Sequence, residues 1–246
     1  MEMQNQIKEY VAQYEKEVRK LADQLRNECM PQPTEELFSE FETNGNRIRY
    51  EAVYFGRRKF LSVLGLASVI WREKEDIQKL EEVIREICAE ECWALPAHVR
   101  RKENPNWRGV IDLFASETGQ TLAHITTLLK DELSEDVITL AQNEVKARIL
   151  KPFIESKVPY ASWEQATNNW NAVCCGNVGS ASLLLMKEGT EKKKLLERLN
   201  YALEHYYLEG FGMSGGAWLL GIWLYVFYII CISTKRIRSI KGSYGI

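Results

Sequence analysis

The sequence has few of the residues that build a metal centre or a disulfide framework. Its 246 residues include three histidines and six cysteines. The histidines are far apart, and the cysteines show neither CxxC spacing nor a zinc-ligand pattern. Cys88 and Cys92 lie four residues apart on a predicted helix, too far along its axis for an easy bridge. We therefore expect reduced, mostly buried thiols, no metal, no cofactor and a cytoplasmic location.

The sequence also lacks an excess of charge of either sign. The net charge is -2 and the pI is about 6.1, so no basic field is expected to recruit nucleic acid. The short basic runs at residues 57–59 and 100–102 are typical of solvated faces. The first residues contain no apolar run of the kind found in secretory signals, so no secretory signal peptide is expected.

No stretch before residue 210 alternates apolar and polar residues as a strand would, so the predicted class is all-α. A short helix is expected to begin at Thr34, and a capping box at Ser162 predicts another. An apolar helix through residues 183–186 is expected to end at Gly189. The first predicted helix carries one apolar stripe, made of Ile7, Val11, Tyr14, Val18, Leu21 and Leu25. The other predicted helices cover residues 50–71, 74–92, 110–129, 134–154 and 190–207.

The helices come in pairs, each with an inner apolar member and an outer amphipathic one. Residues 50–71 and 74–92 are expected to form an antiparallel hairpin. Such pairs, separated by aromatic loops at one end, are typical of an (α/α) toroid whose loops surround a cleft. The predicted organisation is an N-terminal helical segment at 1–44, an incomplete toroid at 45–211 and a divergent apolar and basic tail at 212–246.

Two aromatic and polar stretches are the candidate binding elements. Residues 168–181 begin with three amides around Trp170 and are interpreted as a loop that faces a cleft and leads into a buried helix. The simpler alternative is an Asn-rich helix start that caps its own backbone. The loop that carries Trp93, His98 and Trp107 is unusual, because loops seldom hold large aromatics. Indole faces can support sugar rings; alternatively, both tryptophans close helix ends.

Three motifs in this order resemble the N-terminal toroid of heparinase II/III-like polysaccharide lyases. They are Cys92-Trp93 through His98, Ile111-Asp112-Leu113-Phe114-Ala115-Ser116-Glu117-Thr118-Gly119, and Asn168-Asn169-Trp170-Asn171-Ala172-Val173-Cys174. The resemblance covers about residues 45–211. It implies an incomplete toroid followed by a β-sandwich, and cleavage of acidic polysaccharides by β-elimination at a uronic acid.

The resemblance also implies site residues. Asn169 matches an Asn that neutralises the uronate carboxylate, but Trp170 stands where family members carry His. Asn168, Trp170, Trp93, His98 and Trp107 are then the expected substrate-binding residues. Leu208-Glu209-Gly210-Phe211-Gly212 looks like the approach to the family's tyrosine segment, and the match breaks after it.

The tail admits three interpretations. Residues 215–232 form an uncharged run of about 18 residues, the lower limit for a membrane span, followed by a basic flank. A frameshift near codon 212, a C-terminal membrane anchor and a buried last helix all fit this pattern.

The expected function is that of a polysaccharide lyase lacking its sandwich domain, weakly active or inactive because its catalytic set is incomplete, with an acidic polysaccharide or oligosaccharide as partner. The alternative is a non-catalytic helical interaction module, anchored to a membrane by its C-terminus. A helical glycosidase is a weaker option, with Asp112, Glu117 and Glu209 as its candidate carboxylates.

Overall fold

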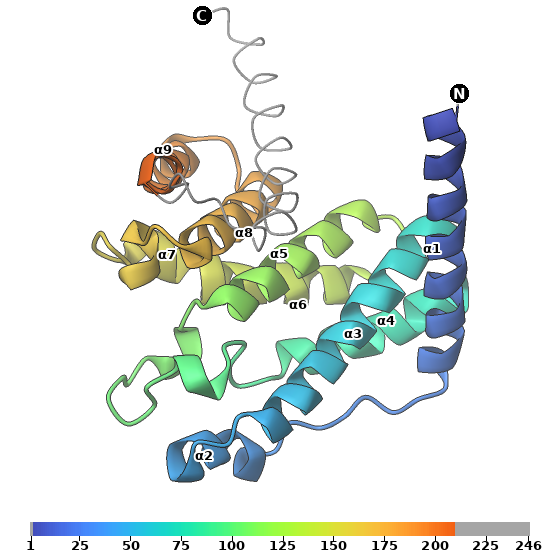
Figure 1. The fold of residues 1–246 in the computed structure, drawn as a ribbon, viewed down its shortest axis with the longest axis horizontal. Coiled ribbons are helices and arrows are strands. Elements are labelled where there is room, and N and C mark those ends of the chain that lie inside the picture. Colours follow the sequence, from blue (N-terminus) through green and yellow to red (C-terminus); the bar gives the residue numbers. More distant parts are fainter. Residues whose placement is uncertain (1, 210–246) are drawn as a thin grey trace, which may run out of the picture. The chain divides into compact units, whose positions relative to one another are not determined.

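The computed structural model describes residues 2–209, and all regular structure in that range is helical (Figure 1). The predicted all-α class is confirmed for this range. The tail at 212–246, including the apolar run at 215–232, lies outside the described residues. The chain divides into two compact units, Met1–Glu90 with Ile125–Ala141, and Glu91–His124 with Gln142–Ile246.

The first unit is built around an antiparallel helical hairpin. Helices α3 (Ile48–Trp71) and α4 (Lys74–Cys88) pack against each other across a two-residue connection, as predicted. The buried residues of α3 lie on one broad face, and those of α4 also lie on one face. Helix α3 was predicted to be apolar on more than one face, but Phe55 and Ile70 are 42% and 37% exposed, so its opposite face is open to solvent. Helix α4 ends four residues before the predicted end at Cys92, and Glu90 turns back toward α3.

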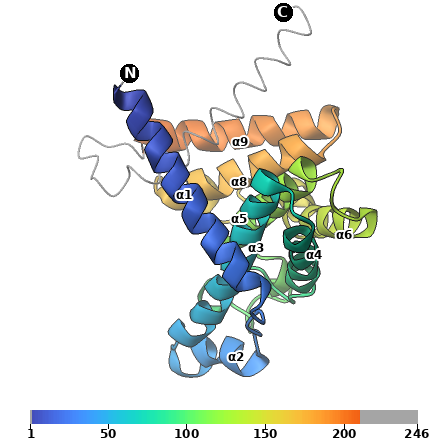
Figure 2. The same ribbon diagram turned by 90° about the vertical axis from the view of Figure 1, so that its right-hand side faces the viewer.

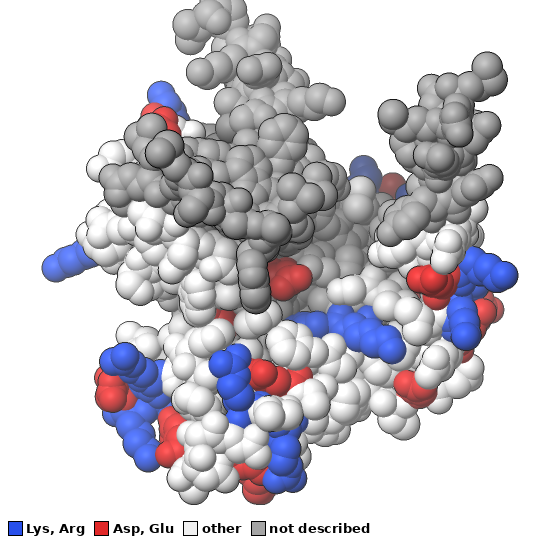
Figure 3. Space-filling model, in the orientation of Figure 1, with Lys and Arg blue, Asp and Glu red and all other residues white. Residues whose placement is uncertain are grey.

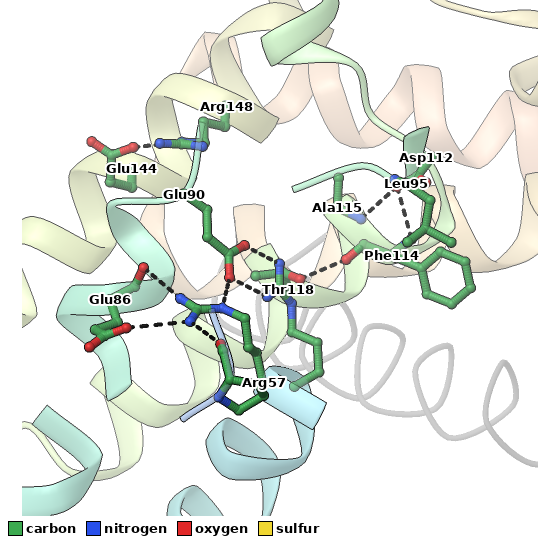
Figure 4. A network of polar contacts seen from close by, with 12 residues as sticks. Arg57, Glu86, Glu90, Leu95, Asp112, Phe114, Ala115, Thr118, Glu144 and Arg148 are labelled. Atoms are coloured by element: carbon green, nitrogen blue, oxygen red, sulfur yellow. Dashed lines mark hydrogen bonds and ion pairs between the residues drawn. The ribbon is translucent and has the colours of Figure 1, made fainter. Parts of the chain in front are cut away.

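Glu90 joins the two helices of the hairpin through buried charges (Figure 4). The Arg57 guanidinium is 2% exposed and donates to Glu90 Oε1 at 2.5 Å and to the Glu86 carbonyl at 3.0 Å. Arg58 makes a bidentate contact with the Glu90 carboxylate, at 2.8 and 2.7 Å. Two guanidinium groups on one carboxylate satisfy its lone pairs, which a buried ion requires. The basic run at 57–59 is therefore partly internal, not wholly solvated.

Helix α1 (Glu2–Arg26) lies beside α3 in both ribbon views (Figures 1 and 2). Val18, Ala22 and Leu25 bury the contact at helical spacing. Tyr14 was predicted to share this face but is 54% exposed. Helix α2 (Glu35–Asn44) begins at Thr34 as predicted, and the Thr34 side chain accepts the Leu37 N–H.

Helix α6 (Glu135–Val145), whose residues up to Ala141 belong to the first unit, continues without a break through a π-helical turn at Lys146–Leu150 into α7 (Lys151–Glu155) of the second unit. The π turn comes directly before Pro152, whose ring and missing N–H do not fit an ordinary helical turn. The same turn carries Ile149 against Gly119 of α5 (Leu113–Leu128). A Cβ built on Gly119 would lie 2.7 Å from Ile149 Cγ1, so this close approach requires glycine.

Helices α8 (Asn169–Leu185) and α9 (Thr190–Glu209) pack side by side (Figure 2). Almost every residue of α8 from Asn171 to Leu183 is buried, so the predicted apolar helix is confirmed. It ends at Leu185, before the predicted stop at Gly189. The Lys192 ammonium occupies that end, where it donates to the Leu183 and Met186 carbonyls.

Basic and acidic side chains lie next to one another on the face drawn in Figure 3. Ion pairs between exposed side chains include Lys151–Glu155 and Arg108–Glu91. Among residues 2–209, no helix is long and apolar enough to cross a membrane.

Candidate functional site

The third motif forms the start of a helix. Asn168 has extended backbone angles, and its Oδ1 accepts the Trp170 N–H at 3.1 Å, so it is the N-cap of α8. The interpretation of residues 168–181 as a loop is therefore wrong from Asn169 onward. The capping alternative is confirmed for Asn168, because its side chain accepts a backbone N–H of the first helical turn.

His98 and Trp170 come into contact at this helix start, although 72 positions separate them in the sequence. Their ring centroids are 4.8 Å apart in an edge-on arrangement with an interplanar angle of 71°. His98 also stacks in parallel with Phe114, with ring centroids 6.1 Å apart. The Trp170 and Asn169 side chains are half-buried, and Asn168 is exposed. This aromatic cluster thus remains partly open to solvent.

Asp112 holds the His98 imidazole in place through a hydrogen bond. Its Oδ2 lies 2.6 Å from His98 Nδ1 and also accepts the Leu95 N–H at 3.1 Å. Its Oδ1 accepts the N–H groups of Phe114 and Ala115, which makes Asp112 the N-cap of α5 (Figure 4). The Asp112 carboxylate is 1% exposed, whereas the His98 side chain keeps 17% of its surface.

From the sequence, Asp112 was predicted only as a weak glycosidase candidate, and its hydrogen bond to His98 was not predicted. An Asp directly before an apolar helical run is an N-cap signal, so the cap could have been found. The contact between His98 and Asp112 could not have been predicted from the sequence. It forms only when the segment at 96–98 folds back toward Asp112. Glu117, the second glycosidase candidate, is exposed on α5, and the side chain of Glu209 lies outside the described residues.

Trp93 and Trp107 are buried, at 1% and 6% exposure. The Arg148 guanidinium lies over the Trp93 ring at 4.8 Å, and Arg101 and Arg108 lie over the Trp107 ring at 4.8 and 4.4 Å. Guanidinium groups thus cover ring faces that a sugar would need. Trp93 and Trp107 belong to the same unit as the aromatic cluster.

Two buried groups of this region, the Cys174 thiol and the Tyr160 hydroxyl, have raised pKa values. Burial raises the pKa of the Cys174 thiol well above its ordinary value, and the nearby Asp112 charge adds to the shift. Burial also raises the pKa of Tyr160, whose hydroxyl accepts the Ile111 N–H and donates to the Gly109 carbonyl. The two Tyr160 hydrogen bonds hold the loop that leads to Asp112.

The turn before Asn168 is held by a buried ion pair. Residues Ser162–Gln165 form a single 3-10 turn in which Ser162 makes no cap bond, so the predicted capping box is wrong. Instead the Glu164 carboxylate receives Arg198 Nε at 2.5 Å and Nη2 at 2.7 Å. It also accepts the Tyr160 N–H, and this use of its oxygens fixes the turn.

Within residues 2–209, no group of three or more His, Cys, Asp or Glu side chains could hold a metal ion. The described cysteines are free thiols, and Cys29 is the exposed one among them. The arrangement therefore offers aromatic contact, carboxamide hydrogen bonds and one oriented imidazole. No protein-family model and no curated protein matches the chain, so the heparinase II/III resemblance rests on the three motifs alone.

Proposed function

We propose that the aromatic cluster of His98, Phe114 and Trp170 binds a uronate-containing polysaccharide. One observation carries the proposal: the three motifs of the resemblance, far apart in the sequence, contribute His98, Asp112 with Phe114, and Trp170 to one place. A half-buried indole beside carboxamides suits a sugar ring, because the ring stacks while its hydroxyls accept and donate hydrogen bonds.

Asn169 is the proposed partner of the uronate carboxylate. Its carboxamide is half-buried and makes no hydrogen bond to any residue within 2–209. A neutral donor at this place can stabilise the charge that develops on a carboxylate when the adjacent proton leaves. The proposed activity is a slow β-elimination of the polysaccharide lyase type, within the incomplete toroid that the resemblance implies.

Binding of uronate oligosaccharides by the full chain, measured by titration calorimetry, tests the proposal. Trp170→Ala is expected to weaken binding about tenfold, which corresponds to about 1.4 kcal/mol of lost stacking. Asn169→Ala should weaken binding of the uronate more than binding of a neutral oligosaccharide of equal length. Tyr201→Ala removes a 71% exposed aromatic side chain outside the cluster and is the matched control.

The alternative, a helical interaction module, gives a different result. There the wild-type chain binds no uronate oligosaccharide, and Trp170→Ala changes only the stability of the fold. Equal loss of affinity in Trp170→Ala and Tyr201→Ala would also contradict a site at the cluster.

A further inference from the structure

The imidazole of His98 is held at one nitrogen only. Asp112 Oδ2 lies 2.6 Å from Nδ1, and an ionised carboxylate can only accept, so Nδ1 carries the hydrogen. The lone pair is then on Nε2. No residue within 2–209 hydrogen-bonds to that nitrogen. The histidine is therefore in the tautomer that can take up a proton at Nε2.

The surroundings of His98 keep the ring in this orientation. Phe114 stacks against it at an interplanar angle of 4°, and the edge-on contact with Trp170 limits its rotation. Asp112 itself cannot turn, because the backbone N–H groups of Leu95, Phe114 and Ala115 occupy its oxygens. A base whose partner is fixed in this way needs little reorganisation when it becomes charged.

We propose that His98 is the catalytic base of the site and that Asp112 is its positioning residue. The inference rests on the proposed function, because it requires a uronate bound at the cluster. Trp170 and Asn169 bind but cannot take up a proton, since neither an indole nor a carboxamide has a basic nitrogen. The imidazole beside them supplies the group that the elimination needs.

The step balances without any further reactant. Nε2 of His98 takes the proton from C5 of the uronate, and the C–H electron pair becomes the C4=C5 double bond. The C4–O bond breaks, and its electron pair goes to the leaving oxygen. The imidazolium, stabilised by the Asp112 carboxylate, then gives the proton to that oxygen. The products are an unsaturated uronate, a new sugar hydroxyl and His98 in its starting form.

The experiment follows the ultraviolet absorbance of the unsaturated product with the full chain and polygalacturonate, alginate and hyaluronan. His98→Ala is expected to lower kcat about a hundredfold or more, the range of a lost general base. Added imidazole should restore part of this rate. His98→Asn keeps an N–H donor toward Asp112, and its loss of turnover should be much larger than its loss of affinity for the oligosaccharide.

Asp112→Asn is expected to lower kcat at unchanged KM, because it places an amide N–H where Nδ1–H needs an acceptor. A purely structural role would raise KM or abolish folding. Unchanged turnover in His98→Ala, or a loss of affinity in His98→Asn as large as its loss of turnover, would overturn the assignment of a catalytic base. A wild-type chain that binds but never produces the unsaturated product overturns the inference and leaves the binding proposal intact. Absence of binding removes both.

Discussion

Removal of the Glu164 carboxylate tests what holds the turn before the aromatic cluster. Glu164 is 2% exposed and receives two nitrogens of Arg198 and the Tyr160 N–H. The Arg198 side chain is itself only 14% exposed. In Glu164→Ala its charge would lose the carboxylate and keep backbone carbonyls, including that of Phe153 at 2.8 Å. Removing one partner of a buried ion pair costs about 3 to 5 kcal/mol of unfolding free energy.

Urea denaturation followed by tryptophan fluorescence measures this cost. With an m-value of about 2 to 3 kcal/mol per M, the midpoint should fall by about 1 to 2.5 M. The matched control is Glu197→Ala, whose partner Lys193 lies 3.9 Å away with both side chains exposed. An exposed pair of this spacing contributes about 0.5 kcal/mol or less. A loss below about 1 kcal/mol in Glu164→Ala, or an equal loss in both variants, would refute the reasoning.

Two further predictions concern the second unit. Gly119→Ala places a Cβ against Ile149 Cγ1 and should cost about 1 to 2 kcal/mol after the gain in helix propensity; Gly109→Ala, whose Cβ meets nothing within 4 Å, should leave the urea midpoint unchanged. Equal midpoints for the two variants would show that the helices can move apart. Burial raises the pKa of Cys174 and Cys175 above their ordinary 9.0, so the folded chain keeps protons that unfolded thiols release. Stability is then full below about pH 9 and falls as pH rises through the raised folded-state pKa; the urea midpoint at about pH 8 and 10 checks this, and replacing both cysteines by Ala should flatten the slope.

The sequence by itself determined the helices and several of their ends. The period of apolar residues predicts α3 and α4 because a helix that buries one face must repeat that face every three to four positions. The cap at Thr34 is local for the same reason, since donor and acceptor lie within one turn. The start of α8 at Asn168 is also local, and the capping alternative described it correctly.

The tertiary structure alone decided which groups meet. The contact of His98 with Asp112 and Trp170 depends on a loop and two helix starts that come together only in the folded chain. The burial of Trp93 and Trp107 also depends on the tertiary structure. Both were predicted to bind sugar rings, but both are buried with guanidinium groups over their ring faces. Glu164 was expected to lie inside a capping box, but its carboxylate instead pairs with Arg198, which is distant in the sequence. Sequence spacing reports neighbours within a turn of helix, whereas long-range pairs depend on packing energies that no local pattern contains.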